Sequence, residues 1–249
     1  MKIGLIGYGN MGKEVARVAM ERGHEIAAII DPMAKEATAK AVSADALKNV
    51  EVCIDFSAPA SVLENVEKVA ALKKNLVLGT TGWYEKTPQV KASVQKHGTG
   101  FVYASNFSVG VNAFYRIVAN AAEIMDKLRD YDVFGYELHH NRKADSPSGT
   151  ARSLAQVVLD HFKRKKKAVY DKLDRRIAAE ELHFASVRGG NIPGTHVIGF
   201  DSMADTIELK HEARSRAGFA LGAVLAAEWL RGKKGFYGVE DFMNGLLEG

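Results

Sequence analysis

Short apolar runs alternate with segments of helical spacing along the first hundred residues. Residues 10–23 carry Val15, Val18 and Ala19 at helical spacing, and residues 58–74 carry a second apolar helical face. The apolar runs that surround these segments are expected to be buried strands; they span residues 2–7, 24–31, 51–56, 75–82 and 100–107. Strands that alternate with helices in this way predict an α/β domain whose parallel sheet is covered on both faces.

The pattern changes after residue 107. Two further helices are predicted over residues 111–128 and 148–167, with a strand over 131–140 between them. Alternating apolar and polar positions then predict half-exposed strands, which span residues 180–188, 194–202 and 205–214. These elements predict a smaller α+β domain with an open mixed or antiparallel sheet and helices on one face.

The last segments return to helical patterns over residues 215–233 and 238–249 and are expected to pack on the first domain. We therefore predict a first domain of residues 1–107 completed by helices within 215–249, and a second domain of residues 108–214.

Composition excludes several classes of protein. The net charge is +4, and the run Lys163–Lys167 supplies five of the 34 basic residues, which leaves 29 against 30 acidic ones. We expect this run to be a solvated helix end, and we expect no nucleic-acid partner. The single cysteine, Cys53, has apolar neighbours and should be a buried small hydrophobic residue. No signal peptide or membrane span is predicted, so we expect a reducing, cytoplasmic location.

A glycine-rich turn follows the first predicted strand and opens the first predicted helix. It reads Gly7, Tyr8, Gly9, Asn10, Met11, Gly12, the pattern G-x-G-x-x-G, and Asp31 lies nineteen residues after its last glycine. This context is that of a Rossmann-type dinucleotide fingerprint. The first glycine permits the tight turn, the second lets the backbone approach a pyrophosphate, and the third allows close helix packing. Asp31 can accept both ribose hydroxyls of the adenosine half.

Ligands of such sheets bind beyond the carboxyl ends of the strands. Small and hydroxylated residues recur at these ends; they are Ser57, then Gly79, Thr80 and Thr81, and then Ala104, Ser105 and Asn106 before Phe107. Their recurrence predicts room for a nicotinamide and its ribose.

The stretch "ELHHNRKADSPSGTAR" concentrates proton-carrying and anion-binding groups between a strand and a helix. His139 and His140 end the strand, Ser148 is a good N-cap, and Gly149 and Thr150 lie in the first helical turn with unpaired amides. Lys143 adds a mobile cation. Because adjacent strand residues point to opposite faces, the two histidines should have different roles, which argues against a metal site. The stretch predicts a pocket for an anionic small molecule that needs a proton.

This stretch closely resembles the signature H-H-x-x-K-x-D-x-P-S-G-T-A of the 4-hydroxy-tetrahydrodipicolinate reductase (dihydrodipicolinate reductase) family. The segments "GTTG" and "ASNFSVGVN" and the glycine turn match that family in order, so the resemblance spans nearly the whole chain. It implies reduction of a small cyclic, unsaturated dicarboxylate by NADH or NADPH on the route to diaminopimelate and lysine. It also implies a Rossmann domain, a substrate domain and a homotetramer joined through the sheets of the substrate domains.

The resemblance assigns roles by motif. His139 matches the proton donor, Lys143 the lysine paired with it, and His140, Gly149 and Thr150 match substrate-binding positions. The matching cofactor contacts are Gly7, Tyr8, Gly9, Asn10, Met11, Gly12, Asp31, Gly79, Thr80, Thr81, Ala104, Ser105, Asn106 and Phe107. The chain departs from the family in its short segment from Asp31 to Glu51, and in Arg142, which stands where many members have another histidine.

The residues are compatible with either cofactor and with two further functions. Asp31 should repel a 2′-phosphate and favour NADH, whereas Lys35 or Lys13 would be the phosphate partner if NADPH is preferred. The alternatives to the reductase are another small-molecule NAD(P)-dependent dehydrogenase and a non-catalytic dinucleotide sensor. The sensor explains the glycine turn but leaves the histidine and lysine cluster unexplained, and a thioester-forming semialdehyde enzyme would want a cysteine in the second domain.

Overall fold

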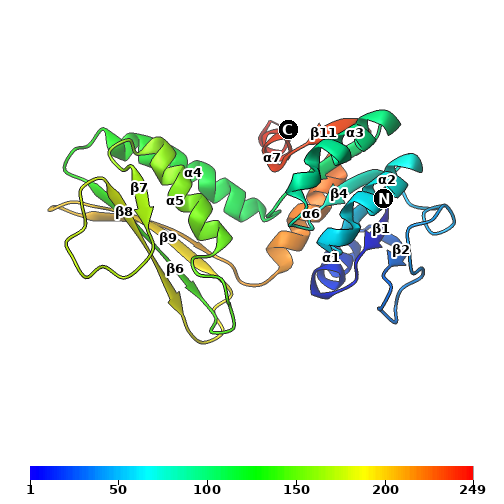
Figure 1. Ribbon diagram of the computed structural model, residues 1–249, viewed down its shortest axis with the longest axis horizontal. Helices are drawn as coiled ribbons and strands as arrows, with labels where there is room; N and C mark the ends of the chain where they lie inside the picture. The colour runs from blue at the N-terminus through cyan, green and yellow to red at the C-terminus, as the bar shows by residue number, and fades with distance from the viewer. Residues whose placement is uncertain (249) are drawn as a thin grey trace. The chain divides into compact units, whose positions relative to one another are not determined.

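The computed structural model describes residues 1–248, and Figure 1 traces the chain by colour. The chain forms two compact units, residues 1–109 with 216–249 and residues 110–215. The predicted fold class is confirmed, because one unit holds a parallel sheet and the other a mixed sheet. Residue 249, the last of the predicted C-terminal helix, lies outside the described residues.

The first unit is built on a six-stranded sheet of order β11-β5-β4-β3-β1-β2. All its pairings are parallel. The strands are β1 Lys2–Ile6, β2 Glu25–Ile30, β3 Val52–Asp55, β4 Asn75–Leu78, β5 Gly100–Tyr103 and β11 Gly235–Tyr237. The first five were predicted. β11 was missed because its three residues, the first of which is Gly235, carry no strand signal of their own.

Helices cover both faces of this sheet. α1 (Asn10–Glu21) packs against α6 (Ala217–Trp229), whereas α2 (Val62–Ala71) packs against α3 (Thr87–His97). α7 (Val239–Leu247) contacts α6, and short 3-10 turns span Pro59–Ser61 and Tyr84–Lys86. The sequence did not predict α3, since its polar pattern buries little besides Val90 and Val94.

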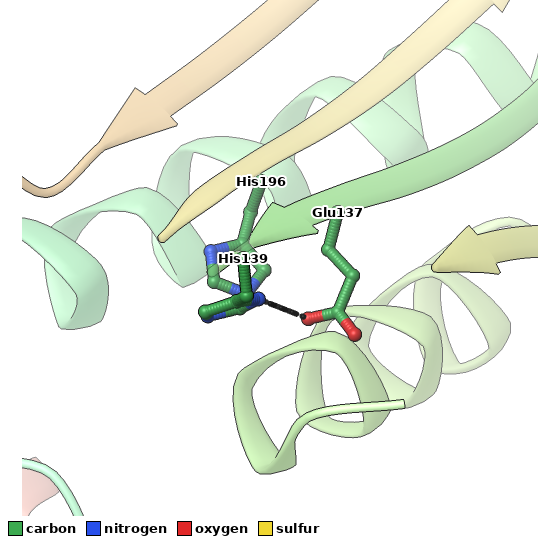
Figure 2. Close-up of side chains that lie close together, drawn as sticks. All are labelled: Glu137, His139 and His196. Atoms are coloured by element: carbon green, nitrogen blue, oxygen red, sulfur yellow. Dashed lines mark ion pairs between the residues drawn. The ribbon is translucent and has the colours of Figure 1, made fainter. Parts of the chain in front are cut away.

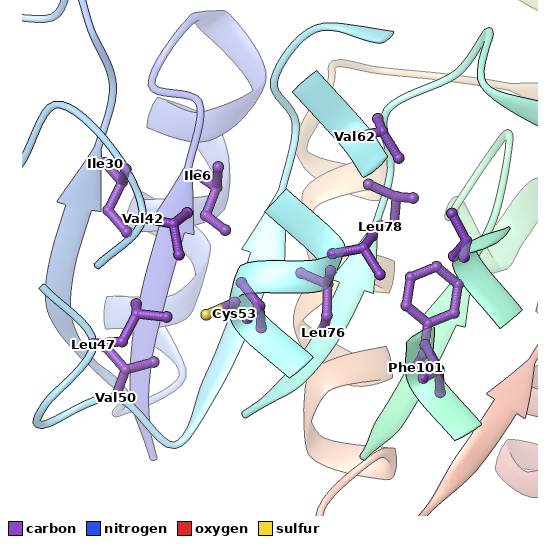
Figure 3. Close-up of a cluster of buried hydrophobic side chains, with 14 of the residues drawn as sticks. Ile6, Ile30, Val42, Leu47, Val50, Cys53, Val62, Leu76, Leu78 and Phe101 are labelled. Carbon is purple, nitrogen blue, oxygen red and sulfur yellow. The ribbon is translucent and has the colours of Figure 1, made fainter. Parts of the chain in front are cut away.

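The segment between β2 and β3 contains no helix and packs as an irregular chain. Its Val42, Leu47 and Val50 are buried and join the core cluster that Figure 3 shows, together with Ile6, Leu76 and Phe101. Cys53 lies in the same cluster with no exposed surface, as predicted. Burial raises the pKa of its thiol, so the cysteine is a core residue.

The second unit has a five-stranded sheet of order β10-β9-β6-β8-β7. The strands are β6 Asp132–His139, β7 Lys167–Val169, β8 Glu181–Arg188, β9 Thr195–Asp201 and β10 Thr206–Glu212. β6, β9 and β10 pair antiparallel, whereas β6 with β8 and β8 with β7 pair parallel. α4 (Val109–Asp126) and α5 (Gly149–His161) supply the helical side of its core.

Two predictions for the second unit are wrong. β9 was expected to be half exposed, but Thr195–Phe200 is buried because this strand lies between β6 and β10, and the Phe134 ring covers Gly199. The basic run was expected to be a solvated helix end, but α5 ends at His161. Lys165 is only 2% exposed, pairs with Asp132 at 2.6 Å and donates to the carbonyl oxygen of Ala179. Part of the run is therefore structural.

None of the helices within residues 1–248 is long and apolar enough to cross a membrane. This includes α6, the most apolar of the predicted helices, which spans Ala217–Trp229 and is largely buried.

Candidate active site

The glycine turn joins β1 to α1 in a conformation that requires its glycines. Gly7 has φ +87°, and a Cβ there would lie 2.4 Å from the carbonyl oxygen of Phe56. A Cβ on Gly12 would lie 2.2 Å from the carbonyl oxygen of Gly7. Gly9 has nothing within 4 Å of its Cβ position. The turn is therefore closely packed on its inner side and open at the N-terminus of α1, where free amides attract anions.

A cavity of about 530 Å³ opens beside this turn. Gly7, Gly9 and Asp31 line it, and so does Lys40, which no sequence motif indicated. Lys35 is exposed and is not among the lining residues, and Lys13 pairs with Glu36 at 3.1 Å.

The carboxylate of Asp31 ties the end of β2 to the glycine turn. Its Oδ2 accepts the backbone N–H of Tyr8 at 2.7 Å, and its Oδ1 accepts those of Met33 and Ala34 at 2.8 Å each. These hydrogen bonds, led by that from Tyr8, lower the pKa of Asp31. The carboxylate therefore remains ionised at the edge of the cavity.

Two smaller cavities lie at the ends of the neighbouring strands. One of about 230 Å³ is lined by Met11, Gly79, Thr80 and Thr81, among others. One of about 380 Å³ is lined by Ala104 and Ser105 together with Gly238–Glu240. Of the remaining predicted cofactor positions, Tyr8, Asn10, Gly12, Asn106 and Phe107 line none of these three cavities. Phe107 is a core residue that contacts Phe242.

A buried carboxylate that no sequence motif indicated supports these strand ends. Asp55 has no exposed surface and accepts hydrogen bonds from Ser57, Thr80 and Asn65. Burial raises its pKa, and the hydrogen bonds oppose that rise. Asp55 thus holds two of the loops that line the cavities.

In the second unit, His139 ends β6 and is 7% exposed. Strand alternation places Glu137 on the same face, and antiparallel register brings His196 of β9 opposite Glu137. Figure 2 shows the three side chains gathered together. The Nδ1 atom of His139 lies 3.2 Å from Oε2 of Glu137, and Nε2 of His196 lies 3.4 Å from the same oxygen.

The other oxygen of Glu137 is held by three donors. The backbone N–H of Ser148, the hydroxyl of Ser186 and the Arg188 guanidinium donate to Oε1 at 2.8–2.9 Å. Burial alone would raise the pKa of Glu137, but the contacts with its partners, led by His196, outweigh burial and lower the pKa. Glu137 is therefore an ionised carboxylate with no exposed surface.

The environment of His139 favours the neutral imidazole. Burial is the main cause that lowers its pKa to about 4, and the charges of His196, Lys143 and Arg188 add to this effect. The Glu137 carboxylate acts in the opposite direction. Beyond Glu137, the imidazole therefore needs a further anionic neighbour before it takes up a proton.

The loop after β6 carries the predicted cation and the predicted helix start. Nζ of Lys143 contacts both carboxylate oxygens of Asp145, at 2.7 and 2.9 Å, and lowers the pKa of that carboxyl. Ser148 is the N-cap of α5 as predicted, since its Oγ accepts the backbone N–H of Ala151 at 3.1 Å. Within the described chain, no hydrogen bond uses the backbone amides of Gly149 and Thr150.

His140 and Arg142 face other partners. The backbone N–H of His140 donates to the carbonyl oxygen of Ile192, and its buried Nδ1 has no partner within residues 1–248. Arg142, the departure from the family pattern, donates to the side chain of Asn191 at 3.2 Å and is exposed.

Four residues of the site were not predicted from the sequence: Glu137, Ser186, Arg188 and His196. Glu137 carried one usable signal, because it lies two residues before His139 on a predicted strand and so shares its face. Ser186, Arg188 and His196 come from other strands, and only the strand register brings them to the site.

The cluster also has the composition of a metal site. Glu137, His139 and His196 each offer a ligand atom within 4.8 Å of the others. However, Arg188 already neutralises the Glu137 carboxylate at 2.8 Å, which weakens the attraction for a metal cation. The arrangement favours proton chemistry on the imidazoles.

Three features together define a class of enzyme. They are a parallel sheet with a glycine turn, an ionised Asp31 at the end of β2, and a second unit with a buried histidine beside a helix start whose amides are free. This class is that of the two-domain nicotinamide-dinucleotide oxidoreductases. Residues 1–107 match the family model "Dihydrodipicolinate reductase, N-terminus", and residues 110–243 match "Dihydrodipicolinate reductase, C-terminus". The chain belongs to the dihydrodipicolinate reductase family.

Curated relatives agree over nearly the full length. The chain is 37% identical to the 4-hydroxy-tetrahydrodipicolinate reductase of Christiangramia forsetii, with 100% of both chains covered. It is 39% identical to the enzyme of the same name from Staphylococcus haemolyticus, covering 92% of this chain and 95% of that one. The resemblance stated from the sequence is thereby confirmed.

Solved structures show the same fold. The dipicolinate-bound dihydrodipicolinate reductase from Paenisporosarcina sp. TG-14 superposes with a TM-score of 0.78 at 22% identity, covering 97% of this chain and 98% of that one. The DAP dehydrogenase of C. glutamicum superposes with a TM-score of 0.54 at 13% identity, covering 98% of this chain and 95% of that one. At these identities the likeness concerns the fold alone.

Proposed function

We propose that this protein reduces 4-hydroxy-tetrahydrodipicolinate, by way of dihydrodipicolinate, to tetrahydrodipicolinate with NADH or NADPH, in diaminopimelate and lysine biosynthesis. The observation that carries this proposal is the loop after β6. It combines a buried imidazole, a lysine and an open helix start in a chain that belongs to the dihydrodipicolinate reductase family. Both substrate carboxylates and the proton that the reaction needs find a matching group there.

Hydride adds to the ring at the far end of a conjugated imine, and the electron pair moves to nitrogen. The resulting enamine then takes a proton on carbon, which His139 delivers. Lys143 leaves Asp145 to hold one carboxylate with His140, and the amides of Gly149 and Thr150 at the start of α5 hold the other.

The nicotinamide cofactor is assigned to the first unit. The free amides at the start of α1 suit the pyrophosphate, Asp31 suits the adenosine ribose, and the cavities at Thr80 and Ser105 suit the nicotinamide half. The ionised carboxylate of Asp31 favours NADH over NADPH. Lys40, which lines the same cavity, is the cation that would accommodate a 2′-phosphate.

The absorbance of reduced nicotinamide, followed with synthase-generated substrate, tests the function. We expect oxidation of NADH and NADPH, with the larger kcat/KM for NADH. The variant His139→Gln should lower kcat by about 10²- to 10⁴-fold with a smaller change in KM, the range typical of general acid catalysis. Lys143→Ala should impair both turnover and substrate affinity. A folded wild-type protein that binds NADH but leaves the substrate unreduced would favour the dinucleotide sensor instead.

Other small-molecule dehydrogenases remain the second alternative. The presence of two carboxylate-binding groups distinguishes the proposed enzyme from them, because a substrate with one carboxylate leaves either Lys143 or the start of α5 without a partner. Activity on an amino acid or a semialdehyde that exceeds activity on the cyclic dicarboxylate would support that alternative.

We further propose a homotetramer in the cytoplasm. Strand β10 is an edge of its sheet and is exposed along most of its length, and Val187 and Met203 add exposed apolar surface to the same unit. Sedimentation of the purified protein at several concentrations tests the assembly, for which we expect the mass of four chains.

A further inference from the structure

The two carboxylate oxygens of Glu137 have different surroundings. Its Oε1 already has three donors, which come from the start of α5 and from β8. A carboxylate oxygen held by three donors cannot rotate away, so the direction of Oε2 is determined as well.

Oε2 points to the imidazoles. His139 Nδ1 lies 3.2 Å away and His196 Nε2 lies 3.4 Å away. Within residues 1–248, Oε2 of Glu137 and Nδ1 of His139 are both buried and neither makes a hydrogen bond, so the two atoms are within reach of each other but are not aligned as donor and acceptor. Nδ1 of His139 is the nearer of the two imidazole nitrogens to Oε2, and a small rotation of either side chain would align this pair. Leaving both buried atoms unpaired would carry the full cost of desolvation.

The opposite nitrogen of the ring has a different environment. A Cβ on Gly194, whose φ of +152° suits glycine, would lie 2.9 Å from Nε2 of His139. Only a glycine leaves room beside Nε2, which makes no hydrogen bond within the described chain and, unlike Nδ1, is not a fully buried atom. Nδ1 is thus buried beside the Glu137 carboxylate, whereas Nε2 lies against the backbone of Gly194 and keeps some accessible surface.

We propose that Glu137 is the positioning residue of the site: its Oε2 accepts the Nδ1 proton of His139 and so reserves Nε2 for proton exchange with the substrate. This inference rests on the proposed role of His139 as proton donor. In the transfer step, the Nε2–H bond of the imidazolium breaks, its electron pair stays on nitrogen, and a C–H bond forms on the substrate ring. The imidazole that remains carries its proton on Nδ1, which is the tautomer that Glu137 stabilises.

The variant Glu137→Gln reverses this arrangement. The three donors require an acceptor at the Oε1 position, so the amide oxygen of the glutamine should take that place. Its NH₂ group then faces Nδ1 of His139 and makes that nitrogen an acceptor, which moves the ring proton to Nε2. We expect kcat to fall by about 10²- to 10⁴-fold, as where other buried carboxylates orient a catalytic imidazole, with KM changed roughly threefold or less.

Nitrogen-15 NMR of the histidine rings reads the tautomer directly and needs no substrate. We expect the Nδ1–H tautomer for His139 in the wild type and the Nε2–H tautomer in Glu137→Gln. Glu181→Gln is a matched control, because Glu181 is 2% exposed and pairs with Arg175 at 2.8 Å in the same sheet. This control should lose stability but keep the wild-type tautomer and kcat.

Two results would overturn the proposal. One is an Nε2–H tautomer of His139 in the wild type, which can be observed even if Glu137→Gln does not fold. The other is a folded Glu137→Gln protein that retains the wild-type tautomer and turnover. If the wild type fails to reduce the cyclic dicarboxylate, the proposed function fails, while the tautomer still decides the role of Glu137.

Discussion

Binding of a dicarboxylate should draw a proton onto His139. The perturbation is the addition of pyridine-2,6-dicarboxylate, a flat dianion at neutral pH that should compete with the substrate. The pKa of His139 is about 4. At pH 7, three pH units higher, roughly one molecule in a thousand then carries the imidazolium.

The expected rise in the pKa of His139 follows from the charges around its ring. Glu137 on β6 already raises the pKa of His139, and Lys143, Arg188 and His196 lower it. An opposite charge within about 4–6 Å raises the pKa of a cationic group by about 1–3 units, so two carboxylates should raise it to roughly 6–10. About 0.1 to 1 proton per site should therefore be taken up at pH 7, and affinity should rise as pH falls through the pKa of the complex.

Calorimetry in two buffers with different ionisation enthalpies measures this uptake. The apparent binding enthalpy should depend on the buffer for the wild type and should lose most of that dependence in His139→Gln. His183→Gln, which removes a half-buried imidazole from β8, should retain it. Equal enthalpies in both buffers for the wild type would refute the reasoning, and so would an undiminished dependence in His139→Gln.

Two further predictions concern the first unit. Gly7→Ala should destabilise the protein by about 2–5 kcal/mol in urea unfolding, since its Cβ would meet the carbonyl oxygen of Phe56 at 2.4 Å in a strained backbone. In Gly9→Ala the new Cβ meets nothing within 4 Å, so this variant should weaken NADH binding while its stability stays near that of the wild type. Lys40→Ala should lower kcat/KM for NADPH at least tenfold, the loss of one charge-assisted contact, with little change for NADH. Lys35→Ala, outside the cavity, serves as its control, and equal losses in both lysine variants would contradict the assignment to Lys40.

Much of the fold could be predicted because its signals are local. The five apolar runs of the first unit, the glycine turn and the N-cap Ser148 depend on neighbours within a few residues, and the structure has each where the pattern indicated. Elements with weak local signals were missed. β7 and β11 have three residues each, and α3 buries few apolar side chains, so the packing of the rest of the chain decides their conformation.

The basic run shows the limit of a charge pattern. Five consecutive cations indicate a solvated segment, since an isolated buried lysine is costly. Lys165 is nevertheless buried because Asp132 and the carbonyl oxygen of Ala179 satisfy it. Those partners belong to β6 and to the segment before β8, which the sequence around Lys165 does not contain.

The sequence by itself determined the class of fold, the position of the glycine turn and the concentration of His139, Lys143 and the helix start in one loop. Those features are local, because each depends on spacing along a strand or at a helix end. Only the tertiary structure decided the pKa of His139. Glu137 acquires Arg188 and His196 through the parallel register with β8 and the antiparallel register with β9, and burial between those strands determines the charge of the imidazole.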